Sequence, residues 1–183
     1  MTDEIVETTK AFQRDWEKFH AGRQPSGPLL RSDKDLPWVR FHSLPNSKRC
    51  PESDSERAII LRRANLLGEL LLGPVDCWLV STNPSCQGAA WAYGGQIEYD
   101  LGTVDEFIVP YLVQATSWRS GKFDVCLTAI AEDDDRCVWV SRKDGSVFAP
   151  YDGGFDLFAV SPDRIATIRQ KWPEWLSSEP TGL

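Results

Sequence analysis

Apolar residues recur at helical spacing in three segments of the chain. The first is residues 3–20, where one apolar stripe is separated from the charged positions, which predicts an amphipathic helix. A second helix is expected to run from the capping-box pattern at Ser53 to the stop signal at Gly73-Pro74. The third begins at Ser161-Pro162 and is expected to kink or restart at Pro173. The stripe of the first helix consists of Ile5, Phe12, Trp16 and Phe19, and Thr2 is its candidate cap.

Short runs of β-branched and aromatic residues, bounded by Gly, Pro and Asp, predict strands elsewhere in the chain. The densest group lies in residues 122–158 and predicts an antiparallel meander. A loop is expected at 83–95 and a short helix at 104–109. The expected strands are 38–43, 77–81, 96–99, 111–118, 123–130, 136–141 and 146–149, and a linker rich in Gly, Pro and charge is expected at 21–37.

This order of elements predicts an α+β fold. A mostly antiparallel sheet is expected to be packed by the N-terminal, middle and C-terminal helices in two layers. A chain of 183 residues is expected to form a single domain, 1–183, with residues 1–37 packing on it as a helix plus linker. At this length one hydrophobic core suffices without disulfides or a bound metal.

Charge and hydropathy narrow the possible partners. The formal net charge is −7, so the chain lacks the positive charge density that binds nucleic acid, and we expect no nucleic-acid partner. An acidic chain suits a basic protein partner, although plain solubility explains the same charge. The apolar stretches are too short to span a bilayer and the acidic N-terminus does not resemble a signal peptide, so we expect neither membrane insertion nor export.

The cysteine pattern favours a reducing compartment. The number of cysteines is odd, no C-x-x-C pair occurs, and three of them lie in apolar runs where cysteine behaves as a small buried hydrophobe. A cytoplasmic location is therefore expected. The cysteines are Cys50, Cys77, Cys86, Cys126 and Cys137.

The motifs for cofactors, metals and nucleophiles are incomplete. The chain has no Gly-rich nucleotide loop and no zinc-type Cys/His spacing, so neither a cofactor nor a metal is predicted. The acidic run at 132–135 lacks the spaced ligands of a calcium loop and is expected to be a solvated hairpin tip. His42 is the one credible base and Cys86 is a loop thiol, but no pattern brings them together, so no catalytic residue is predicted.

Two polar segments far apart in the chain are the candidate site. Residues 40–49 concentrate cationic side chains in an acidic chain, and residues 149–156 carry two aspartates beside a tyrosine. One interpretation is a structural network in which Arg40 pairs with Asp152 or Asp156, and Tyr151 packs beside them. The other is a site that holds an anion between the two segments. The candidate ligand-binding residues are Arg40, His42, Lys48, Arg49, Tyr151, Asp152 and Asp156.

The same segments carry a family resemblance. The strings R-F-H-S-L-P-N-S-K-R at Arg40–Arg49, A-P-Y-D-G-G-F-D at Ala149–Asp156 and W-L-S-S-E-P-T-G-L at Trp175–Leu183 resemble a family of uncharacterised bacterial proteins. That family is known only as a domain of unknown function. The resemblance covers the chain from Trp38 onward, and it implies no activity, cofactor or catalytic residue.

Two classes of function follow from the sequence. The first is a non-enzymatic protein-interaction module, indicated by the acidic charge, eight tryptophans and the incomplete catalytic motifs. Small acidic α+β proteins of this kind resemble toxin-neutralising immunity proteins in general character. The alternative is a binder of, or an enzyme acting on, a small anionic ligand held by the candidate residues. A third interpretation is that both segments have a purely structural role. Of the three, the sequence favours the interaction module.

Overall fold

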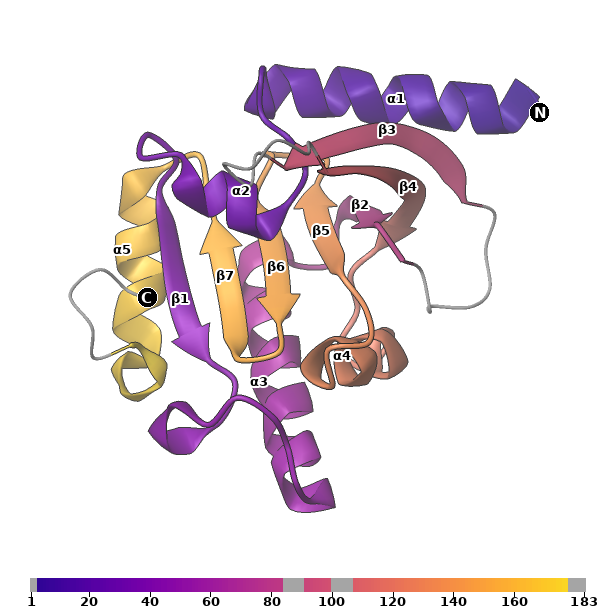
Figure 1. Cartoon of the computed structure of the whole chain (residues 1–183). Coiled ribbons are helices and arrows are strands. Elements are labelled where there is room, and N and C mark those ends of the chain that lie inside the picture. The colour runs from indigo at the N-terminus through magenta and orange to yellow at the C-terminus, as the bar shows by residue number, and fades with distance from the viewer. Residues whose placement is uncertain (1–2, 84–90, 100–106, 178–183) are drawn as a thin grey trace.

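The fold is built on a seven-stranded sheet in which all neighbouring strands are antiparallel (Figure 1). The computed structural model describes residues 3–83, 91–99 and 107–177. Across the sheet the strands follow the order β1-β7-β6-β5-β2-β4-β3. Their bounds are β1 Trp38–His42, β2 Asp76–Ser81, β3 Ala92–Tyr99, β4 Phe107–Ser117, β5 Cys137–Ser141, β6 Val147–Tyr151 and β7 Gly154–Phe158.

Helices cover both faces of this sheet. The three long helices predicted from the sequence are present, and Ser53 caps the middle one by accepting a hydrogen bond from the backbone N–H of Glu56. The helix after Ser161 ends before Pro173, which begins a short 3-10 turn, Pro173–Trp175. The helices are α1 Asp3–His20, α2 Gly27–Ser32, α3 Asp54–Leu72, α4 Asp124–Ala131 and α5 Pro162–Lys171.

The strand alternation divides the core into two halves. In β5, Val138 and Val140 pack in one cluster with residues of α1 and α2, whereas Trp139 between them packs in the other cluster with α3, α4 and α5. Figure 1 shows α2 in front of the sheet and α3 behind it. The α+β class is therefore confirmed, but the helices form two outer layers around the sheet, so the expected two-layer packing is wrong.

Aromatic side chains fill the half of the core beneath α3. The rings of Trp118 and Trp139 meet edge to face with their centroids 5.5 Å apart, and Phe123 and Phe148 pack on both rings. Gly68 of α3 makes this packing possible, because a Cβ atom there would lie only 2.0 Å from the Trp118 indole. The aromatic cluster thus holds the helix close to the sheet.

Several predicted elements differ from the structure. Residues 123–130 were expected to form a strand, but residues 124–131 form α4, which buries Leu127 and Ile130 in the core cluster that α3 also lines. The linker at 21–37 contains the short helix α2. Strand β3 begins at Ala92 rather than at 96, and strand β4 includes residues 107–109, where a helix was expected. Residues 84–90 of the predicted loop, residues 104–106 of the predicted helix and the candidate cap Thr2 lie outside the described residues.

The state of the cysteines bears on the expected compartment. Cys126 is disulfide-bonded, whereas Cys50, Cys77 and Cys137 are free. The disulfide at Cys126 argues against the reducing compartment that the cysteine pattern favoured, and the cytoplasmic location stays a prediction. Within the described ranges, none of the helices has the length and apolar character needed to cross a membrane.

Candidate functional site

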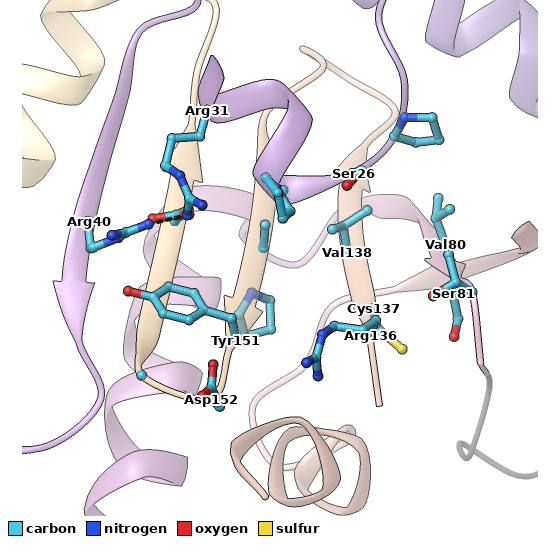
Figure 2. A pocket seen from close by; sticks show the side chains of 18 of the residues that line it. Ser26, Arg31, Arg40, Val80, Ser81, Arg136, Cys137, Val138, Tyr151 and Asp152 are labelled. Carbon is cyan, nitrogen blue, oxygen red and sulfur yellow. Dashed lines mark hydrogen bonds and ion pairs between the residues drawn. The ribbon is translucent and has the colours of Figure 1, made fainter. Parts of the chain in front are cut away.

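A cavity of about 550 Å³ lies on the sheet face that α1 and α2 cover. Its wall includes residues 25–28 and Arg31, so the segment that leads into α2 closes one side of it. Strands β1, β7, β6, β5, β2 and β3 contribute to the lining, together with loop residues such as Arg49, Arg136 and Asp152. Figure 2 shows Arg31 and Arg40 on one side of this cavity and Val80 and Ser81 on the other.

The strand register explains which side chains form the cavity floor. Arg40 lies directly opposite Asp156 in the β1–β7 pair, and Asp156 lies opposite Ala149 in the β7–β6 pair. Val138 lies opposite Val80 in the β5–β2 pair. Directly opposed residues project from the same face of an antiparallel sheet. The floor therefore runs from a charged end at β1 and β7 to an apolar end at β5 and β2.

Three small residues on this face lie where larger side chains would not fit. Ala149 occupies the centre of the floor, and Gly27 of α2 approaches it so closely that a Cβ on Gly27 would lie 3.0 Å from the Ala149 Cβ. Gly154 lies between His42 and Tyr151 in the β1–β7–β6 register, and a Cβ there would lie 2.3 Å from the Phe41 carbonyl oxygen. The small size of Ala149 and Gly27 leaves space in the cavity that larger residues would fill, and Gly154 lets β7 lie close to the Phe41 carbonyl of β1.

Two arginines share one buried carboxylate at the charged end. The Arg40 Nε donates to Asp156 Oδ1 at 2.9 Å and its Nη2 donates to Oδ2 at 3.2 Å, a bidentate arrangement. Arg31 Nη1 donates to the same Oδ2 at 2.8 Å. The Asp156 side chain is 2% exposed, and those of Arg40 and Arg31 are 9% and 27% exposed. The cluster therefore carries two positive charges against one negative charge in a largely buried position.

Aromatic rings hold Arg40 in place. Its guanidinium carbon lies 4.9 Å from the Tyr151 ring centroid and 5.5 Å from that of Trp38. Burial acts to lower the pKa of Arg40, but the hydrogen bonds and the charge of Asp156 outweigh it and raise the pKa. Burial, helped by the charge of Asp156, raises the pKa of Tyr151 to about 12, so its hydroxyl keeps its proton at neutral pH. Arg40 thus remains a fixed cation and Tyr151 a neutral donor.

Two further arginines line the cavity closer to solvent. Arg49 pairs with Asp152, which also lines the cavity, and Arg136 pairs with Asp133, which does not. The Arg49 and Arg136 side chains are 71% and 50% exposed, so their ion pairs are weak and open to exchange with a ligand. The lining thus carries four arginines and two aspartates in a chain that is acidic overall.

His42 and Ser47 meet at the edge of the cavity. The Ser47 hydroxyl lies 3.2 Å from His42 Nε2, and both residues belong to the lining. Burial, with the positive charges of Arg40 and Arg63, lowers the pKa of His42, so the ring is neutral at pH 7 and can accept the hydroxyl proton. Asn46 and Ser47 both have φ of +57°, an uncommon backbone conformation that fixes the position of the Ser47 side chain. This pair can transfer a proton to or from a bound group.

The structure brings together six of the seven predicted site residues. Arg40, His42, Arg49, Tyr151, Asp152 and Asp156 all line the cavity. Lys48 is not among the lining residues, because its ammonium pairs with Glu52 and Glu56 at the start of α3. Of the two partners proposed for Arg40, Asp156 is the one it binds, and Asp152 binds Arg49 instead.

Sequence reasoning missed Arg31 and Arg136. Arg31 lies in the segment predicted as a linker, and Arg136 was assigned only to the start of a strand. A usable signal for Arg136 existed, because it lies between the acidic run at 132–135 and the start of β5 at Cys137. Among the described residues no group of three or more His, Cys, Asp or Glu side chains is arranged to hold a metal ion.

Fold and site together define an α+β domain with an arginine-lined cavity on one face of an antiparallel sheet. The chain belongs to the protein family described as a domain of unknown function (DUF3885), which it matches over residues 27–180. The match begins in α2, so it includes Arg31 and extends further towards the N-terminus than the resemblance from Trp38 onward. No curated protein and no solved structure matches the chain.

Proposed function

We propose that this protein binds a small anionic molecule in the cavity, with Arg31 and Arg40 as its main contacts. The observation that supports the proposal is the charge of the buried cluster, in which Asp156 neutralises only one of two guanidinium groups. An unpaired cation away from bulk water is unfavourable unless an anion approaches it. A ligand anion at this end of the cavity removes that penalty.

The geometry of the side chains supports an anion rather than a cation or a neutral sugar. Arginine presents a planar fork of donors that matches the oxygens of a carboxylate or phosphate. Asp156 already occupies part of each fork, which orients the remaining N–H groups. Arg49 and Arg136 lie closer to solvent, where they can attract an anion and then exchange their carboxylate partners for it.

A thermal-shift experiment tests the proposal with inorganic pyrophosphate as the probe at constant ionic strength. A ligand that binds only the folded state stabilises it by RT ln(1 + [L]/Kd), so the Tm of the wild type should rise with pyrophosphate concentration. Arg31→Gln is the informative variant, because Arg40 still pairs with Asp156 through two hydrogen bonds when Arg31 is lost. We expect this variant to lose most of the shift.

Arg14→Gln provides the matched control. It removes the same charge from α1, where the Arg14 side chain is exposed and pairs only with Glu7 among the interactions of the described residues. Arg14→Gln should keep the full shift. Equal shifts in the wild type and in Arg31→Gln, or the absence of any shift in the wild type, would overturn the proposed function.

A protein-interaction role remains a second proposal, and one surface supports it. Tyr93 of β3 and Ile108 of β4 are large exposed apolar side chains near the edge of the sheet. Tyr93 lies opposite Leu112, which is four residues from Ile108 on β4, so both project from one face. A photo-crosslinking residue at Tyr93 should link the chain to a basic protein, and one at exposed Val125 of α4 should not.

A further inference from the structure

We infer that the ligand is an amphipathic organic phosphate, with its phosphate group at Arg31 and Arg40 and its apolar part over Val138 and Val80. The inference rests on the proposed anion binding and adds the class of molecule that carries the anion. It follows from three features of the cavity: the separation of its charged and apolar ends, its length, and the number of donors at the charged end.

The apolar end consists of side chains that are buried and still line the cavity. Val80 and Val138 are 2% and 8% exposed, and they lie opposite each other in the β2–β5 pair. Ile97 of β3, Pro25 before α2 and Pro28 within α2 line the cavity as well. An inorganic ion bound at the arginines makes no contact that removes these groups from water. A ligand with an apolar body gains the free energy of burying that body against them.

The distance across the floor requires an extended ligand. The charged end at β1 is separated from Val138 on β5 by β7 and β6, three spacings between neighbouring strands. At about 4.8 Å for each spacing, the backbones of β1 and β5 are about 14 Å apart. A cavity of about 550 Å³ falls in the range of about 300–1,000 Å³ that is typical of sites for small organic molecules. Figure 2 shows Arg31 and Arg40 at one end, Val80 at the other and Val138 between them.

The donors at the charged end favour phosphate over a single carboxylate. A phosphate monoester offers three acceptor oxygens and a charge near −2 at neutral pH. The guanidinium groups of Arg31 and Arg40 share one carboxylate, and the protonated Tyr151 hydroxyl and Arg49 line the same part of the cavity. A carboxylate offers only two oxygens and one charge, so it matches fewer of these donors.

Calorimetry with matched probes tests the inference. Inorganic phosphate, methyl phosphate and phenyl phosphate carry the same group with an increasing apolar part, and benzoate carries the apolar ring with a carboxylate. Burial of one CH₂ group changes affinity roughly fourfold, so we expect phenyl phosphate to bind at least about tenfold more tightly than inorganic phosphate. Methyl phosphate should be intermediate, and benzoate should bind more weakly than phenyl phosphate. This series needs only the wild-type protein.

A variant locates the apolar part of the ligand. Val138→Thr keeps nearly the same volume and adds a hydroxyl to the cavity floor. We expect it to reduce the advantage of phenyl phosphate over inorganic phosphate several-fold while the Kd of inorganic phosphate stays unchanged. Val125→Thr, at an exposed position on α4, is the control and should change neither Kd.

The outcomes separate this inference from the proposed function. If inorganic phosphate binds through Arg31 and phenyl phosphate binds no more tightly than inorganic phosphate, the proposed anion binding is supported. The inference that the ligand is amphipathic is then wrong. If benzoate binds as tightly as phenyl phosphate, the assignment of a phosphate group is wrong. If no probe binds to the wild type, both the proposed function and this inference fail.

Discussion

Arg40 and Asp156 lie directly opposite each other on β1 and β7, and the Arg40 Nε lies 2.9 Å from Asp156 Oδ1. The two residues are 116 positions apart in the chain, and both side chains are almost fully buried. Arg31 adds a second guanidinium to the same carboxylate. A buried pair with one extra cation is a poor way to stabilise a fold, because desolvation offsets most of the attraction. Arg31, Arg40 and Asp156 all line the cavity, where an anion of the kind proposed would neutralise the extra charge.

Replacing Asp156 with asparagine should lower the free energy of unfolding by about 3 kcal/mol. The change leaves Arg40 and Arg31 as buried cations without a counter-charge, and breaking a buried pair from one side costs about 3–5 kcal/mol. Urea denaturation measures the loss. Asp152→Asn is the control, because the Arg49 partner of Asp152 is mostly exposed and the loss should be much smaller. Similar losses in the two variants would mean that the buried cluster does not have the role described for it.

Gly68→Ala should destabilise the protein even though alanine favours helices more than glycine does. A Cβ at this position would lie 2.0 Å from the Trp118 indole, so α3 or the indole must shift, and overpacking of this kind costs about 1–3 kcal/mol. Gly22→Ala provides a contrast, because Gly22 has φ of +72° and no atom within 4 Å of the added Cβ. Thermal melts of the two variants compare a steric clash with backbone strain alone. A Gly68→Ala variant as stable as the wild type would contradict the packing around Trp118.

Stability should fall as the pH drops below about 6.5, and His20 should account for part of the loss. His20 is buried at the end of α1, and its Nε2 donates to the Gly145 carbonyl oxygen at 2.6 Å. Burial lowers its pKa below the ordinary value of 6.5, aided by the charge of Arg23, although the Gly145 carbonyl acts in the opposite direction. The unfolded state therefore takes up a proton at a higher pH than the folded state does, so stability is full above pH 6.5 and decreases as the pH falls towards the folded-state pKa.

The measurement is the free energy of unfolding of the wild type and of His20→Gln between pH 7.5 and 5. Each proton taken up only by the unfolded state contributes a slope of about 1.4 kcal/mol per pH unit. His42, whose pKa is also lowered, contributes in the same direction, so His42→Gln is measured in parallel. The wild type should lose more stability than His20→Gln over this range. Parallel profiles would show that His20 does not titrate differently in the two states.

The sequence predicted the long helices, and it predicted that Arg40 pairs with Asp152 or Asp156, of which the structure has Asp156. Amphipathic stripes and caps are local signals, and an arginine within an acidic chain needs a nearby carboxylate wherever it is buried. The segment at 123–130 was assigned wrongly because a short continuous apolar run is compatible with both a strand and a helix. Only tertiary packing against α3 distinguishes the two.

The cavity itself could not be predicted from the sequence. It depends on the register that aligns Asp156, Ala149 and the residues of β5 and β2 in one row, and register is set by long-range pairing. Arg31 was missed for a similar reason. It belongs to a six-residue helix in a Gly- and Pro-rich segment, which is too short to show periodicity.

An anion bound between Arg31 and Arg40, as proposed, can be located directly by crystallography. Crystals of the full chain soaked in sodium selenate would be measured at the selenium absorption edge, where anomalous difference density locates the ion. We expect a peak within hydrogen-bonding distance of the Arg31 and Arg40 guanidinium groups, and no such peak in crystals of Arg31→Gln. Selenate found only beside other cations such as Arg142 and Lys143, with the cavity free of anomalous density, would contradict anion binding between Arg31 and Arg40.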